Sequence, residues 1–152
     1  MYRGEKMYSY LPNKNNYSDN FLNMLNILKE IIITSKENND FDLSNLTEEN
    51  LIILKKIKNI NSKILEKTEN IFYSLTSVNP DSFSYSNENL DFNNFPFNIL
   101  ISKAIFIDIE LIEKYTKIIN YLPSEKEKNE ILSCIILKQN NISLYNYLLT
   151  KK

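Results

Sequence analysis

Four stretches of this 152-residue sequence place apolar residues three or four positions apart, and this spacing constrains the fold more than any other feature. Apolar side chains at such intervals line one face of an α-helix, and that face is buried against other helices. The stretches lie at about 21–32, 51–75, 97–122 and 131–149. With 43% hydrophobic residues, a chain of this length is able to bury a core of its own. We therefore expect an all-α fold in which four helices form a bundle.

Local signals mark the ends of these helices. The Asn-Asn-Asp run at 38–40 is expected to end the first helix. Thr47 is expected to cap the second, and Ser124, followed by a Glu three positions later, has the spacing of a capping box at the start of the fourth. The third helix is expected to begin near Phe97, directly after Pro96.

Two connections between the helices are short and one is long. The long one, at about 78–96, reaches roughly 60 Å when extended, whereas a helix of about 24 residues is only about 36 Å long. We therefore expect two antiparallel hairpins joined by a crossover that runs the length of the bundle. Its apolar residues would pack against the helices: Phe83, Tyr85, Leu90, Phe92 and Phe95. The expected organisation is an N-terminal tail at 1–17 and a single bundle domain at 18–152.

Composition removes several classes of function. The chain contains no histidine, which excludes Ser-His-Asp and Cys-His catalysis and every His-ligated metal site. Cys134 is the only cysteine, so no intramolecular disulfide forms, and an apolar helix face would keep its thiol inert. Lys and Arg number 18 against 19 for Asp and Glu, without a block of like charge, so we expect no nucleic acid partner. We find no signal peptide and no membrane-spanning run, and expect no membrane partner and a cytoplasmic protein.

Polar residues interrupt three of the apolar stripes near their midpoints. Asp108 lies on the third stripe and Lys138 on the fourth, while Asn61 falls on the second. Asn61 and Lys138 each lie 14 residues after an expected N-cap. Because an unpaired buried charge is costly, we expect Asp108 and Lys138 to form a buried ion pair, with Asn61, Asn141 and Tyr115 completing its hydrogen bonds. The alternative is that Lys138 lies at the bundle edge and its head group reaches water.

The segments AIFIDIELIEKY at 104–115 and ISLYNYLLT at 142–150 resemble the small rubrerythrin-like, ferritin-like proteins of spore-forming bacteria. The segment 47–76 resembles the second helix of that family. The resemblance implies a ferritin-like four-helix bundle. In this family the first and third helices each supply a Glu to a di-metal site, and the second and fourth each supply a Glu-x-x-His pair.

The sequence departs from this pattern at nearly every ligand position. Asp108 falls on the Glu of the third helix, and Glu30 or Ile31 falls on that of the first. The Glu-x-x-His pairs are replaced at four positions: Asn61, Ile64, Lys138 and Asn141. The resemblance therefore implies that the metal site is lost, and we expect no metal, no cofactor and no catalytic residue.

The expected function is that of a non-catalytic structural or protein-interaction module, which associates with itself or with a protein partner. The resemblance also implies an association with spores. One alternative is a ferritin-like oxidoreductase or metal-binding protein with an atypical carboxylate site, built from Asp108, Glu110, Glu30 and Glu66. Two others are a catalytic Lys138 and a helical regulator that masks a partner's helix in an exposed apolar groove.

Overall fold

The computed structural model describes residues 18–38, 46–84 and 95–151. The long helices are α1 (Asp19–Glu37), α2 (Glu48–Thr76), α3 (Phe97–Ile118) and α4 (Glu125–Thr150), with short 3₁₀ turns at η2 (Pro80–Ser82) and η3 (Ile119–Tyr121). These residues contain no strand, which confirms the all-α fold class for the described part of the chain. No helix within it is both long and apolar enough to cross a membrane. The expected tail at 1–17 lies outside the described residues.

Hydroxyl side chains cap the start of three helices. The Oγ of Ser18, the Oγ1 of Thr47 and the Oγ of Ser124 each accept a hydrogen bond from the amide three residues later, at 3.2, 3.2 and 3.3 Å. Each bond satisfies one of the helix-terminal amides that lack a partner within the helix. The expected caps of α2 and α4 are thereby confirmed, and α3 begins at Phe97 directly after Pro96, as expected.

The end of α2 is held in an unusual backbone conformation. Ser77 follows the last helical residue with φ 59° and ψ 16°, in the left-handed region. Its amide donates to the carbonyl of Tyr73 at 2.7 Å. Glycine is the usual residue at such a position because a Cβ makes this conformation unfavourable. Ser77 therefore ends α2 at a conformational cost.

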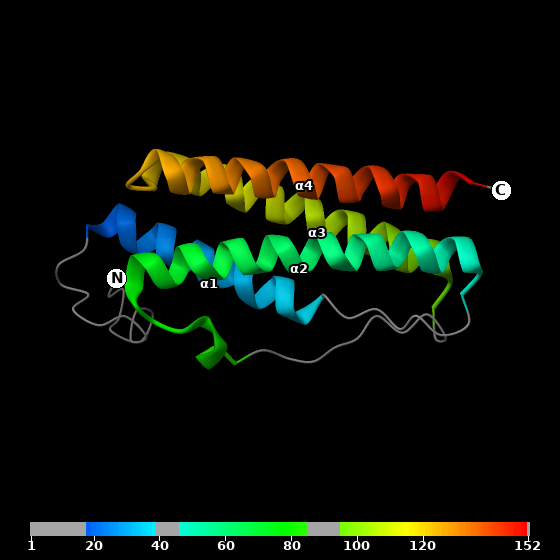
Figure 1. The fold of residues 1–152 in the computed structure, drawn as a ribbon, viewed down its shortest axis with the longest axis horizontal. Helices are drawn as coiled ribbons and strands as arrows, with labels where there is room; N and C mark the ends of the chain where they lie inside the picture. The colour runs from blue at the N-terminus through cyan, green and yellow to red at the C-terminus, as the bar shows by residue number, and fades with distance from the viewer. Residues whose placement is uncertain (1–17, 39–45, 85–94, 152) are drawn as a thin grey trace, which may run out of the picture.

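Figure 1 shows four long helices lying side by side, with α1 and α4 running in one direction and α2 and α3 in the other. Helix α1 packs against α2 and α3, and α4 packs against the same two helices. Each helix therefore contacts two neighbours that run opposite to it. Because α2 ends at one end of the bundle and α3 begins at the other, the chain from 77 to 96 connects opposite ends (Figure 1).

The core consists of two apolar clusters. The larger cluster takes buried residues from all four helices, among them Leu28, Ile32, Ile71, Leu111 and Ile131. The smaller cluster takes them from three helices, without α1: Leu54, Ile57, Leu100, Ile101, Ala104, Tyr145 and Leu148. The polar residues near the helix midpoints lie between the two clusters.

Of the apolar residues expected to pack along the long connection, Phe83 and Phe95 lie in the described part of the chain. Phe83 is buried and packs edge-on against Phe72, with ring centroids 5.2 Å apart, but Phe95 is 56% exposed, so its predicted packing was wrong. Phe95 immediately precedes Pro96 and the start of α3, where the chain has not yet reached the core. Tyr85, Leu90 and Phe92 lie outside the described residues. On α4, Asn141 and Leu148 are buried, whereas their neighbours Ile142 and Leu149 are half-buried.

Candidate functional site

A layer of polar side chains crosses the bundle between the two apolar clusters. Along α3, Asp108 lies between Ala104 of the smaller cluster and Leu111 of the larger one. Lys138 and Asn141 occupy the equivalent stretch of α4, and Asn61 occupies that of α2. We call these four residues the midpoint layer. All four positions continue the apolar spacing of their helices, so the backbone directs polar groups into the core.

The midpoint layer is joined by three short hydrogen bonds. The Lys138 Nζ donates to Asp108 Oδ1 at 3.0 Å and to Asn61 Oδ1 at 2.9 Å. The Asn141 Nδ2 donates to the same Asn61 oxygen at 2.8 Å. Asp108 and Lys138 are each 4% exposed and Asn141 is fully buried. The structure thus brings the two charged groups together inside the bundle, and Lys138 does not lie at its edge.

Two acceptors of the midpoint layer are buried without a hydrogen-bond partner among the described residues: Asp108 Oδ2 and Asn141 Oδ1. An unmet buried acceptor costs about 1–3 kcal/mol. Burial raises the pKa of the Asp108 carboxyl, and the charge and hydrogen bond of Lys138 offset part of this effect. The layer therefore holds an ion pair whose hydrogen bonds are incomplete. A buried pair of this kind contributes little to folding stability.

Tyr145, within the fourth apolar stretch at 131–149, belongs to the same network, a contact that the sequence did not predict. Its ring is 1% exposed, one turn of α4 beyond Asn141. Burial and the negative charge of Asp108 raise the pKa of its hydroxyl, while a hydrogen bond with Asn61 lowers it. The phenol is therefore protonated at neutral pH. The sequence spacing is a signal for this contact, because Tyr145 lies seven residues, or two helical turns, after Lys138 and so on the same side of α4.

Tyr115 does not join the midpoint layer, so that prediction was wrong. Its hydroxyl lies 2.7 Å from the Oγ1 of Thr68, which donates its own proton to the Ile64 carbonyl at 2.9 Å. Tyr115 is therefore the donor to Thr68. The physical reason is that Tyr115, about 10 Å along α3 from Asp108, lies at the level of Thr68 on α2 and not at the level of Asn61.

Cys134 lies beside this second polar group. Its Sγ is 4.0 Å from both the Thr68 hydroxyl and the Ile64 carbonyl, and the residue is fully buried. Burial raises the pKa of the thiol, so the reactive thiolate is disfavoured. This geometry suits a packing role.

The remaining positions of the family pattern do not supply metal ligands. Ile31 is buried on α1, whereas Glu30 is 51% exposed and lies 3.6 Å from Lys114. Ile64 is buried in the larger apolar cluster. No group of three His, Cys, Asp or Glu side chains within residues 18–38, 46–84 and 95–151 is placed to hold a metal ion.

The atypical carboxylate site of the alternative hypothesis does not form. Glu66 and Glu110 are exposed, as is Glu30, and of the four proposed carboxylates only Asp108 is buried. Glu66 and Glu110 fall off the core-facing positions of their helices, so the four carboxylates do not converge. A single buried carboxylate paired with an ammonium group cannot replace such a ligand set.

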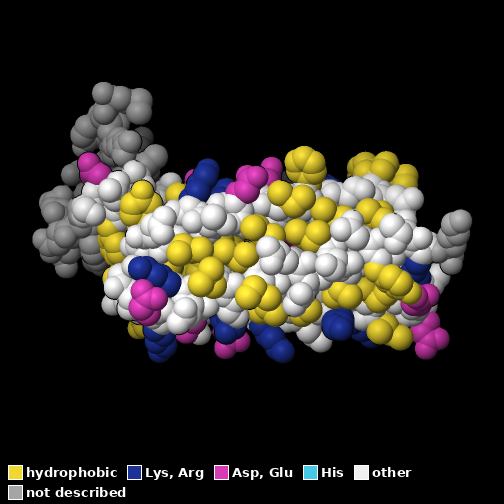
Figure 2. All heavy atoms as spheres, turned by 90° about the horizontal axis from the view of Figure 1, so that it is seen from above, with side chains coloured by type: hydrophobic (Ala, Val, Ile, Leu, Met, Phe, Trp, Pro, Cys, Tyr) yellow, Lys and Arg dark blue, Asp and Glu magenta, His cyan; other side chains and the backbone are white. Residues whose placement is uncertain are grey.

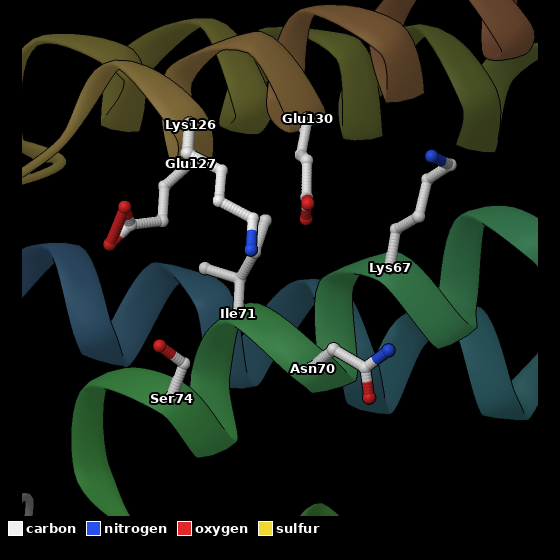
Figure 3. A pocket seen from close by; sticks show the side chains of 7 residues that line it. All are labelled: Lys67, Asn70, Ile71, Ser74, Lys126, Glu127 and Glu130. Carbon is white, nitrogen blue, oxygen red and sulfur yellow. The ribbon is translucent and has the colours of Figure 1, made fainter.

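A surface pocket of about 380 Å³ lies apart from the midpoint layer, between α2 and the first turns of α4. Figure 3 shows side chains of the two helices that point into the space between them. The lining residues are Lys67, Asn70, Ile71, Ser74, Lys126, Glu127 and Glu130. Its two Lys and two Glu balance in charge, so the pocket favours neither an anion nor a cation. A second hollow, of about 390 Å³, lies near η2 and is lined by residues of α2 and of the segment 79–81.

The arrangement therefore holds a charge pair inside the bundle, and the described residues contain no group of three His, Cys, Asp or Glu side chains placed to bind a metal ion there. Comparisons of the sequence with protein-family models and curated proteins, and of the structure with solved structures, find no match.

Proposed function

We propose that this protein is a non-catalytic, ferritin-like four-helix bundle that has lost its di-metal site and acts as a structural or protein-interaction module. The sequence resemblance supplies the family, and the neighbour relations of the helices agree with it. Two pairs of oppositely running helices, with a connection between opposite ends of the bundle, form the arrangement that the family uses.

The position of the Lys138 ammonium group is the observation that carries the proposal. In the family pattern, carboxylates at the positions of Asn61, Asp108 and Lys138 surround metal cations. Here the ammonium nitrogen lies 2.9–3.0 Å from oxygens of Asn61 and Asp108. A covalently attached cation thus lies where the family pattern places bound metal cations, and needs no cofactor.

The residues present do not fit a di-metal centre. Transition metals of this kind need several anionic or imidazole ligands that converge on one point. The midpoint layer offers one carboxylate and two amides, and its ammonium group would repel a metal ion.

The same contacts argue against catalysis by Lys138. A lysine that acts as a base or Schiff-base nucleophile must lose its proton and reach a substrate. Lys138 is 4% exposed and donates to two acceptors, and it lines neither of the two surface hollows. Its contacts suit a structural role.

Metal content tests this proposal. Protein purified without an affinity tag is assayed by elemental analysis, and its thermal unfolding is followed with and without Fe(II), Mn(II) and Zn(II). A metal at about 100 times its Kd would add about 2.7 kcal/mol of stability, which corresponds to roughly 5–11 °C in Tm for a domain of this size. We expect no co-purified metal and no such shift. Stoichiometric metal would overturn the proposal.

A further inference from the structure

The exposed side of α4 carries no charge over five turns. Between Ile131 and Thr150 its single charged residue is Lys138, which is buried in the midpoint layer. At the 24% charged content of the whole chain, 20 residues would hold about five charges (0.24 × 20). The exposed positions are instead apolar or uncharged polar: Leu132, Ile136, Gln139, Asn140, Ser143, Asn146, Tyr147 and Thr150.

Apolar side chains extend this uncharged surface onto α3. We define the α3–α4 face by its exposed apolar residues: Ile99 (56% exposed), Phe106 (68%), Ile109 (43%), Leu132 (44%) and Ile136 (57%). Half-buried isoleucines of both helices lie beside them: Ile105, Ile112, Ile135 and Ile142. Figure 2, which views the bundle from the side of α4, shows hydrophobic side chains spread along its length, with charged groups mostly at the margins. A contiguous apolar surface of this kind marks an interaction site.

The size of the α3–α4 face suits a protein partner. The 20 residues of α4 from Ile131 to Thr150 span about 30 Å, and two adjacent helices, each about 10 Å wide, present a surface about 20 Å across. The resulting area of about 600 Å² per partner lies at the lower end of the roughly 600–1,000 Å² per partner that specific protein interfaces bury.

The chemistry of the face points to a second copy of this chain. In a two-fold symmetric dimer the same surface is used twice, so residues near the axis meet their own copies. A charged residue there would meet a like charge, whereas the amides of Gln139 and Asn140 and the hydroxyl of Ser143 both donate and accept hydrogen bonds. On α3, exposed Glu113 lies one helical turn after Ile109, so we expect the two-fold axis on the α4 side of the face, where the exposed residues between 131 and 150 carry no charge.

We propose that the α3–α4 face is the interface of a two-fold symmetric dimer of this chain. This inference rests on the proposed function as an interaction module, and it names the surface and the partner. The helical regulator of the sequence analysis would use the same exposed apolar residues, but would place a foreign helix on them.

Sedimentation velocity of the full chain at about 100 µM tests the proposal, since interfaces of this area give dissociation constants of micromolar or below. Wild type is compared with Ile136→Glu and, as a second variant, Leu132→Glu. The matched control is Ile52→Glu, because Ile52 is 61% exposed on α2, away from the face. Circular dichroism verifies that each variant is helical. We expect dimers of wild type and Ile52→Glu, and at least a tenfold weaker dimer for both variants of the face.

A monomeric wild type, or a dimer that both face variants leave unchanged, would overturn the inference. The metal assay on the same samples separates this failure from that of the proposed function. A metal-free monomer would contradict the dimer alone, whereas a metal-loaded dimer that Ile136→Glu dissociates would contradict the lost metal site alone.

Discussion

Substitution of Lys138 by methionine tests the energetics of the midpoint layer. Methionine keeps the unbranched length of the lysine side chain but removes its ammonium group. Asp108 Oδ1 then loses its partner, while Asp108 Oδ2 already has none among the described residues. The Asn141 amide still donates to Asn61, so the loss falls mainly on the carboxylate.

The expected cost follows from the burial of the pair. Removing one partner of a buried ion pair typically costs about 3–5 kcal/mol, because the remaining charge stays desolvated. For a domain of this size that corresponds to a fall in Tm of about 6–20 °C. The double variant Lys138→Met with Asp108→Leu removes both charges, and such apolar replacements are neutral or stabilising by about 1–4 kcal/mol. We therefore expect the double variant to recover the lost stability.

Urea unfolding followed by circular dichroism measures these differences. Lys114→Met is the matched control, because Lys114 pairs with Glu30 at 3.6 Å with side chains 32% and 51% exposed. An exposed pair of this kind is worth at most about 1 kcal/mol. If Lys138→Met lost no more stability than Lys114→Met, the buried pair would not exist in solution and the reasoning would be refuted.

Three further predictions concern single groups. Burial raises the folded-state pKa of Asp108 above its usual 3.8. Between the unfolded-state pKa and this raised pKa the folded state binds more protons than the unfolded state, so stability falls as pH rises. The stability of wild type relative to Asp108→Asn, from urea unfolding at increasing pH from about 3.5, should fall; a rise would show that the ion pair outweighs burial. Ser77→Gly should raise stability by about 0.5–1 kcal/mol by relieving the left-handed conformation, and a lower urea midpoint would argue against strain there. Tyr115→Phe should cost only about 1 kcal/mol, because Thr68 keeps its bond to the Ile64 carbonyl; a loss above about 3 kcal/mol would contradict this.

Helix starts were predictable because capping is a local interaction. Thr47 and Ser124 each bond to an amide three residues away, so their roles depend on neighbouring sequence alone. The contact between Asn61 and Lys138 was also foreshadowed, since both lie 14 residues after these caps on helices that run in opposite directions. Equal distances from opposite ends bring two residues to the same level of the bundle.

Other contacts depend on tertiary packing that spacing does not specify. Tyr115 and Tyr145 both lie on core stripes seven residues from a charged residue, yet only Tyr145 reaches the midpoint layer. Tyr115 meets Thr68 and Tyr145 meets Asn61, and the spacing along α3 and α4 alone does not say which residue of α2 lies opposite each ring. The α3–α4 face was missed because Phe106 and Ile136 fall outside the core stripes and were given no role.

A crystal structure of protein soaked in Mn(II), with anomalous data, tests the central claim most directly. The account predicts that the Lys138 Nζ lies between Asp108 and Asn61, at about the 3.0 and 2.9 Å described above, with no anomalous peak in the midpoint layer. An anomalous peak beside Asp108, with the Lys138 side chain displaced toward solvent, would contradict the claim that the protein's own ammonium group has replaced a metal.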